Sequence, residues 1–197
     1  VRTAAARLKI VAMVNSPSGS SGVNVYGIDP VQEKRISGLY TAVYDSATLI
    51  DKLKLSDPAT IAIWLKDSTG SWFEGAQRNP VVIGETLARK LKVRINSKIV
   101  LTFQSAEGNL TGGSYRVCGI YRIDNNAFEE ANIYVRKPDL ASLADLSPGD
   151  AHEVAVFLDD PDRLDETVRT LALQYPGADV LSWKKLLPDV AMLNDLV

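Results

Sequence analysis

The stretch PVVIGETLARKLKV, residues 80–93, joins an apolar run to an amphipathic segment through one glycine, Gly84. Strand, glycine and helix follow one another in the same way in turns that bind nucleotide phosphates. A phosphate cradle needs several glycines and a lysine or helix N-terminus aimed at the anion, whereas Glu85 places a negative charge on the first helical turn. We therefore interpret the stretch as framework, with a strand over 80–83 and a helix over 85–92.

The segments before this stretch alternate between strand and helix patterns. Asp29 and Pro30 match a helix N-cap and first helical position, with Gln32 at the capping-box site. The expected elements are strand 7–15, flexible turn 16–22, strand 23–28, a helix from Pro30, helix 46–53, strand 60–65 and boundary loop 66–79.

The segments after it form a β-rich block and then a last helical region. Asp160 and Pro161 repeat the cap pattern, and Leu164, Val168 and Leu171 give the following helix a core face. The expected elements are strand 98–104, turn 107–113, strand 114–123, strand 132–135, a brief helix from Pro138 and strand 152–158.

These elements predict an α+β fold made of two subdomains. The two ends share a plan of strand, Asp-Pro, helix and strand, and the β-rich block interrupts them. We expect residues 1–75 and 138–197 to form one split α+β subdomain, and residues 76–137 to form a smaller inserted β-rich subdomain.

Composition restricts the function. The 197 residues are 46% hydrophobic, and 22 basic and 24 acidic residues give a net charge of −2 without a polybasic block. We therefore expect a folded protein that does not bind nucleic acid. No run of 18 apolar residues is present. Because the chain starts at Val1 without a methionine and stops inside a periodic segment, we expect it to be an excised domain of a longer polypeptide.

No residue pattern predicts catalysis, a metal or a cofactor. Cys118 is the only cysteine and His152 the only histidine, so a Cys/His site would need these two together. We expect Cys118 to be a small buried group in a strand. The acidic run LDDPDRLDE, residues 158–166, lacks the spacing of a calcium loop and fits helix capping. Four further carboxylates have no spacing that suggests an acid/base pair: Glu85, Glu107, Glu129 and Glu130.

Two places are candidates for a partner or substrate surface. Trp72 and Phe73 lie in the boundary loop, where they either fold back over the core, which we favour, or contact a partner. Asn109 and Leu110 lie at the tip of the hairpin predicted over GNLTGGS, residues 108–114.

The closing segment SWKKLLPDVAMLNDLV, residues 182–197, predicts a helical stalk. Ser182 fits an N-cap, and Trp183 begins an apolar stripe that recurs at spacings of three and four. Pro188 falls inside this helix, removes one backbone hydrogen bond and should kink it. Trp183 and Pro188 are therefore the candidate pivot of the stalk.

Several of these motifs, in this order, resemble one family: the periplasmic core domain of MacB-type ABC transporter permeases, which includes the lipoprotein-releasing LolC and LolE subunits and relatives of FtsX. The motifs are VYGIDP at 25–30, VVIGETLARKLKV at 81–93, the strand KIVLTF, YRVCGIY at 115–121 and SWKKLLP at 182–188. The resemblance covers the chain from about residue 8 to its end, and it implies a porter-like α+β subdomain with an inserted Sabre-like β-rich one.

The resemblance also implies a location and partners. The domain would lie in the periplasm between two membrane helices of an inner-membrane permease, and it would need no cofactor of its own. Its partners would be a cytoplasmic ATP-binding subunit, a second permease subunit, and a periplasmic adaptor or lipoprotein substrate. The domain would relay ATP-driven movement to export or extract a lipoprotein, peptide or drug.

One departure and two alternatives stay open. LolC carries a longer, proline-bearing hairpin for a soluble carrier where this chain has only SAEGNLTGGS, residues 105–114. An exporter, a LolE-like partner subunit or another relative therefore all remain possible. The alternative from another class is a stand-alone small-molecule-binding module in which Trp64, Trp72 and Phe73 line a pocket, and an enzyme is the third.

Overall fold

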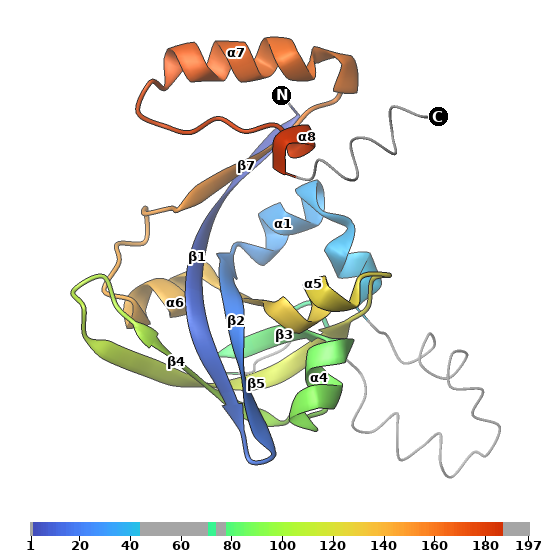
Figure 1. Ribbon diagram of the computed structural model, residues 1–197, viewed down its shortest axis with the longest axis vertical. Helices are drawn as coiled ribbons and strands as arrows, with labels where there is room; N and C mark the ends of the chain where they lie inside the picture. Colours follow the sequence, from blue (N-terminus) through green and yellow to red (C-terminus); the bar gives the residue numbers. More distant parts are fainter. Residues whose placement is uncertain (1, 44–70, 74–77, 187–197) are drawn as a thin grey trace, which may run out of the picture. The chain divides into compact units, whose positions relative to one another are not determined.

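A sheet that closes on itself forms the centre of the larger part of the molecule (Figure 1). The computed structural model describes residues 2–43, 71–73 and 78–186. The helix expected over 46–53 and the strand expected over 60–65 lie outside the described residues. The chain divides into two compact units, a larger one of Ala4–Ala155 and a smaller one that combines Val1–Thr3 with Val156–Val197.

The closed sheet follows an order that differs from the order in the sequence. Neighbouring strands are β2, β6, β3, β5, β4 and β1, and the antiparallel pairing of β1 with β2 completes the ring. Two pairs, β2 with β6 and β3 with β5, are parallel. The strands are β1 (Thr3–Ser16), β2 (Gly19–Ile28), β3 (Pro80–Gly84), β4 (Lys98–Gln104), β5 (Leu110–Tyr121) and β6 (Asn132–Arg136).

Two turns are shorter than the sequence predicts. The flexible turn expected over 16–22 is wrong, because Ser16 already pairs with Gly19 and β2 starts there. The turn expected over 107–113 is also too long, because β5 starts at Leu110. Gly113 lies in β5, where the Leu143 side chain packs directly against it. A Cβ at this position would lie 2.7 Å from that side chain. Glycines that predict turns in sequence thus lie in paired strands.

The inside of the closed sheet is the main core. Alternate residues of every strand point inward, which is the period-2 pattern of a half-buried strand. Members from six strands include Leu8, Val25, Ile83, Leu101, Val117 and Ile133, all with no exposed area. The helices α4 (Glu85–Leu91) and α6 (Lys137–Leu143) add Leu87, Leu91 and Leu140 to it.

Helix starts follow the predicted caps. Asp29 accepts hydrogen bonds from the backbone N–H of Val31 and Gln32 and begins α1 (Pro30–Ile36), as expected. Pro138 lies in the first turn of α6, also as expected. The sequence did not predict the short helix α5 (Asn126–Ala131), which is capped by the Asn125 side chain, and a 3₁₀ helix η1 covers Gly38–Ala42.

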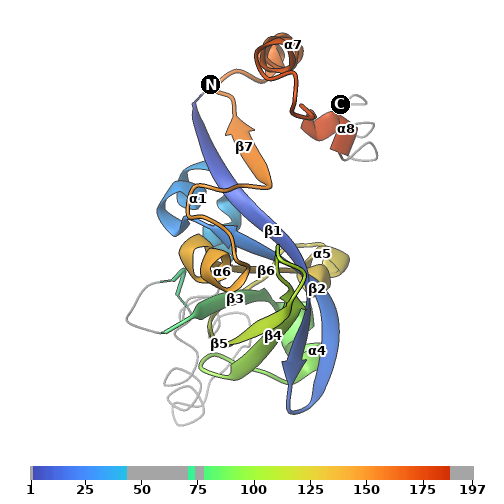
Figure 2. The same cartoon turned by 90° about the vertical axis from the view of Figure 1, so that its left-hand side faces the viewer.

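The smaller unit continues from β7 (Glu153–Phe157), which lies next to β1 in the sheet order. It holds a 3₁₀ turn over Pro161–Arg163, capped by Asp160 as predicted, then α7 (Leu164–Gln174) and α8 (Trp183–Leu186). Figure 2 shows α7 seen along its axis. Leu164, Val168 and Leu171 are half-buried, and none of the described residues from 156 to 186 is buried. The three residues thus form the less exposed side of α7, as their spacing predicted, but they are not fully buried in the described part of the chain.

Mixed helices and strands confirm the α+β class. The division into residues 1–75 with 138–197 and an inserted 76–137 stays a prediction, because residues 44–70 are not described. Within the described residues, the strands of 76–137 share the closed sheet with β1 and β2. No described helix is long and apolar enough to cross a membrane.

Candidate functional site

The turn at Gly84 is framework, because another helix fills the space a ligand would need. A Cβ on Gly84 would lie 2.3 Å from the carbonyl oxygen of Glu129 on α5. The Glu129 carboxylate, itself buried, accepts hydrogen bonds from the backbone N–H and hydroxyl of Thr86 at 3.1 and 2.6 Å. It also accepts the N–H of Ile123 at 2.8 Å. A carboxylate of the chain therefore satisfies the start of α4 where a phosphate would otherwise bind.

The other carboxylates singled out in the sequence are not brought into an acid/base pair. Glu85 is paired with Arg122 and Arg89, and Glu130 with Lys90. Glu107, at the β4–β5 turn, is within 3.5 Å of the Asn109 side chain. Among the described residues, no three His, Cys, Asp or Glu side chains could hold a metal ion together.

Cys118 is buried in β5, as predicted, and its burial raises the pKa of the thiol to about 11. A thiol that stays protonated at neutral pH is a poor nucleophile. His152 lies elsewhere, where its Nδ1 accepts the backbone N–H of Lys9 at 3.0 Å. These two residues therefore make no catalytic pair.

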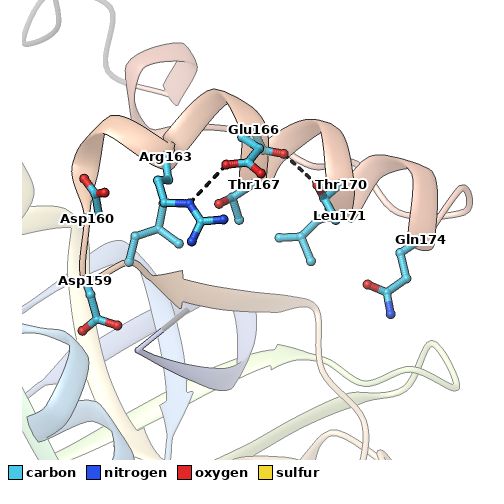
Figure 3. Close-up of a pocket in the computed structure, with 9 residues that line it drawn as sticks. Asp159, Asp160, Arg163, Glu166, Thr167, Thr170, Leu171 and Gln174 are labelled. Carbon is cyan, nitrogen blue, oxygen red and sulfur yellow. Dashed lines mark hydrogen bonds and ion pairs between the residues drawn. The ribbon is translucent and has the colours of Figure 1, made fainter.

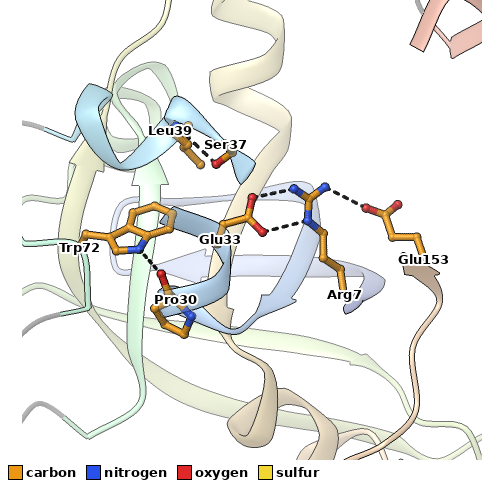
Figure 4. Close-up of polar contacts among 7 residues, drawn as sticks. All are labelled: Arg7, Pro30, Glu33, Ser37, Leu39, Trp72 and Glu153. Carbon is orange, nitrogen blue, oxygen red and sulfur yellow. Dashed lines mark hydrogen bonds and ion pairs between the residues drawn. The ribbon is translucent and has the colours of Figure 1, made fainter. Parts of the chain in front are cut away.

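Trp72 and Phe73 fold back over the sheet, as the favoured interpretation had it. Their exposed fractions are only 5% and 6%, and they pack on Tyr134, Val82 and Cys118 outside the closed sheet. The Trp72 indole N–H donates to the carbonyl of Pro30 at 3.0 Å, which ties this segment to α1 (Figure 4). Both side chains nevertheless line an open hollow of about 500 Å³ beside Pro30, Val31 and Arg136. A partner surface or a small-molecule pocket at Trp72 and Phe73 therefore stays a prediction. The third residue of that alternative, Trp64, lies outside the described residues.

Asn109 and Leu110 lie at the other end of β5 from Cys118, so the structure does not bring the two halves of the candidate surface together. Asn109 is exposed and accepts the N–H of Ser105 through its carbonyl. Leu110 is 81% exposed, which is unusual for a leucine in a paired strand. This half of the candidate surface is accessible.

The start of the predicted stalk is present, but its pivot is not described. The Ser182 hydroxyl accepts the N–H of Lys185 at 3.3 Å, as expected of an N-cap, and Trp183 opens α8 with 39% exposure. Pro188 lies outside the described residues, so its effect on the helix stays a prediction.

A three-part ion pair centred on Arg7 of β1 was not predicted from the sequence. Arg7 donates to both oxygens of Glu33, at 3.0 and 2.6 Å, and to Glu153 at 3.2 Å (Figure 4). Burial alone would lower the pKa of Arg7, but the hydrogen bonds and charges of Glu33 and Glu153 raise it above its ordinary value. Glu33 is 1% exposed. The residues come from β1, α1 and β7, and the cluster fixes these three elements to one another.

The smaller unit contains an open hollow of about 380 Å³ along α7. Figure 3 shows Asp159, Arg163 and Glu166 on one side and Leu171 further along the helix. Arg163 and Glu166 form a fully exposed pair at 3.1 Å. One side of the hollow is apolar and half-buried, and no polar group is enclosed in it. These features are more typical of a contact surface than of an active site.

Comparison with solved structures places this fold. The extracellular domain of the noncanonical ABC-type transporter YknZ from Gram-positive bacteria has a TM-score of 0.51 and 14% identity, over 91% of this chain and 79% of that one. A domain of a Porphyromonas gingivalis protein described as a permease has a TM-score of 0.42 and 13% identity, over 91% and 73%. The second value is too low to support a conclusion. No family model matches the sequence, and no curated protein does.

At this identity the likeness shows the fold alone. The chain has the α+β fold found in the extracellular domain of an ABC-type transporter.

Proposed function

We propose that this chain is the extracytoplasmic domain of an ABC transporter permease of the MacB type, which relays ATP-driven movement from a cytoplasmic ATPase. The observation that carries the proposal is the likeness to the YknZ extracellular domain over 91% of the chain. The order of motifs described above supports the same family. The partners would be the ATPase, a second permease subunit, and an adaptor or a lipoprotein, peptide or drug substrate.

The connection between the two units suits a relay. The chain passes between them twice, between Thr3 and Ala4 in β1 and between Ala155 and Val156 in β7. Both crossings therefore lie within strands rather than in loose loops. The cluster of Arg7, Glu33 and Glu153 fixes β1 to β7 next to the second crossing. In the proposed relay, movement would pass along the chain at these two crossings.

Location is the first property to test. The unmodified protein serves as the control for cysteine labelling, because its single cysteine is buried. Cys118 is buried with a raised pKa, so the unmodified protein should react slowly with a maleimide. Ser18, in the exposed β1–β2 turn, can be replaced by cysteine in the full-length protein. We expect a membrane-impermeant maleimide to label Ser18→Cys in intact cells and not the parent. Labelling that requires cell lysis would refute an extracytoplasmic location.

The relay needs a second measurement, made on the full-length protein purified with its ATPase. Spin labels on Ser18→Cys would report the distance between the domains of two protomers. We expect this distance to differ between the nucleotide-free and ATP-trapped states. A distance distribution that is the same in both states would rule out the relay, even if the location is confirmed.

A further inference from the structure

The outer face of β1, β4 and β5 is an exposed apolar surface on the larger unit. Along each strand every second residue points away from the core and toward solvent. Four apolar members are well exposed: Val11 at 75%, Met13 at 46%, Val100 at 41% and Leu110 at 81%. We call this surface the outer face. Its twelve positions are Lys9, Val11, Met13, Asn15, Lys98, Val100, Thr102, Gln104, Leu110, Gly112, Ser114 and Arg116.

Pairing in the sheet places these residues side by side. Met13 lies opposite Thr102, which lies opposite Gly112 on the next strand. Val100 lies opposite Ser114. Polar residues also lie next to the apolar ones, with Asn15 opposite Val100 and Gln104 opposite Leu110. The apolar side chains therefore share one face of the sheet, with small and polar residues between them.

One end of the outer face carries two cations directly opposite each other. Lys98 on β4 pairs with Arg116 on β5. Like charges at opposed positions are unfavourable in a sheet. Arg116 donates to the carbonyl of Asn96 at 2.7 Å, and within the described part of the chain neither cation pairs with a carboxylate. The fold thus keeps an unfavourable pair of charges in an accessible place.

The positive charge is local and does not reflect the chain as a whole. The net charge is −2, yet residues 86–106 contain five cations and no Asp or Glu. Two of the five, Arg89 and Lys90, are paired with Glu85 and Glu130. None of the twelve outer-face positions is acidic, and Lys9 on β1 adds a cation at the other end of the face. A surface with cations at its ends and apolar groups between them is complementary to a surface with carboxylates around an apolar patch.

We propose that the outer face binds an acidic protein partner, whose carboxylates pair with Lys98 and Arg116 and whose apolar side chains cover Val100, Met13 and Leu110. The face holds no aromatic residue, whereas surfaces that insert into lipid usually present Trp or Phe. Its composition therefore favours a protein over a membrane. The proposal concerns this surface of the larger unit and does not depend on the transport function.

Site-specific cross-linking in cells tests the occupant. A photoreactive amino acid replaces Val100 in the full-length protein, and as a control it replaces Val31, which is 65% exposed on α1. We expect a protein adduct at position 100 and not at position 31. Mass spectrometry should place the cross-link beside Asp or Glu residues of the partner. An adduct with lipid only, with a second copy of this chain only, or with no molecule would overturn the proposal.

Charge reversal tests the basis of recognition. Lys98→Glu with Arg116→Glu should reduce the adduct roughly tenfold, because facing carboxylates would repel the partner. Arg35→Glu with Arg169→Glu changes the net charge equally at exposed sites elsewhere and should leave the adduct unchanged. Lys98→Glu alone serves as the second variant. Its backbone stays paired with β5, and among the described residues the Lys98 side chain makes no hydrogen bond that the substitution would break. An adduct unaffected by both outer-face variants would also overturn the proposal.

A purified probe checks that the face recognises acidic polypeptide directly. Poly-L-glutamate, followed by fluorescence anisotropy, should bind the unmodified chain more weakly as salt rises, because exposed charges are screened. Its affinity should fall roughly tenfold in Lys98→Glu with Arg116→Glu and stay unchanged in Arg35→Glu with Arg169→Glu. Equal binding by all three proteins would show that attraction is not located on the outer face and would contradict the proposal.

Discussion

The two units of this molecule use similar sequence patterns with different results. In the larger unit, Leu87 and Leu91 on α4 have no exposed area, because the closed sheet lies against them. In the smaller unit, Leu164, Val168 and Leu171 have the spacing of a core face on α7 but are only half-buried. An amphipathic pattern shows that a helix has an apolar side, and it does not show that the same chain covers that side.

The ion pairs differ in the same way. Arg7 and Glu33 meet in the larger unit with exposed fractions of 20% and 2%, and Glu153 completes the cluster. Arg163 and Glu166 meet on α7 with 65% and 67% exposure. Burial decides what such a pair contributes, because water screens the exposed one. Stability should therefore reside in the larger unit, and four substitutions or conditions can test that difference.

The largest effect is expected from Gly84→Val. A Cβ at this position meets three backbone atoms of Glu129 at 2.3–2.7 Å, so α5 must move. We expect a loss of about 4 kcal/mol or more in the free energy of unfolding, measured by urea titration with tryptophan fluorescence. Gly22→Ala is the control, because nothing lies within 4 Å of a Cβ there. Equal urea midpoints for the two variants would show that α5 does not press on Gly84.

A smaller difference is expected between two leucine truncations. Leu87→Ala removes a fully buried side chain from the main core and should cost about 3–4 kcal/mol in urea unfolding. Leu171→Ala makes the same chemical change on the half-buried face of α7 and should cost less than about 1 kcal/mol. Comparable costs would mean that α7 is covered as well as α4 is.

The buried ion pair should matter more than the exposed one. Glu33→Ala leaves the Arg7 guanidinium with Glu153 alone, and we expect a cost of about 3 kcal/mol in thermal or urea unfolding. Glu166→Ala should not shift the transition measurably, because its partner Arg163 is solvated. If the two substitutions lower the free energy of unfolding equally, the cluster does not hold β1, α1 and β7 together.

Alkaline pH should act on the larger unit alone. The pKa of Cys118 is about 11 in the folded chain against an ordinary 9.0, so between these values the unfolded thiol ionises first. The stabilising contribution is present below pH 9 and lost as pH rises through 11, by about 2–3 kcal/mol. Burial also raises the pKa of Tyr115, Tyr121 and Tyr134, so the loss continues at higher pH.

Hydrogen exchange between pH 8 and 10.5, corrected for intrinsic rates, can measure this effect unit by unit. Protection of β3 and β5 should fall with pH, while protection of α7 should not follow it. Cys118→Ala should reduce the pH dependence most between 9 and 10, whereas the loss from the three tyrosines, whose ordinary pKa is 10.0, should persist above pH 10. A pH dependence identical in the variant and the parent would assign the effect to groups other than Cys118.

Local sequence signals predicted most of the described elements. Asp29 with Pro30 and Asp160 with Pro161 cap helical turns as expected, because a side-chain oxygen satisfies N–H groups only two or three residues away. The strand over 98–104 was predicted with its bounds. The turns at 16–22 and 107–113 were too long, because the partner strand, which is remote in sequence, decides where a glycine-rich segment is extended.

The residues of the candidate sites divide along the same line. Cys118 was expected in the core from its apolar neighbours, and Trp72, in a polar loop, was favoured to fold back over the core; both are buried. In the cluster of Arg7, Glu33 and Glu153, Arg7 and Glu153 are 146 positions apart in the sequence. No local sequence pattern predicts an ion pair between residues so far apart. The opposed cations Lys98 and Arg116 depend in the same way on the register of β4 against β5.

Composition, capping and periodicity therefore established an α+β chain with framework in place of a phosphate loop, since these properties act over a few residues. The closure of the sheet by β1 and β2, the filling of the Gly84 turn by Glu129, and the outer face needed the folded chain. Each of them is a contact between segments that folding alone brings within a few ångströms. Strand order and register set such contacts, and many orders satisfy the same alternation of apolar and polar residues.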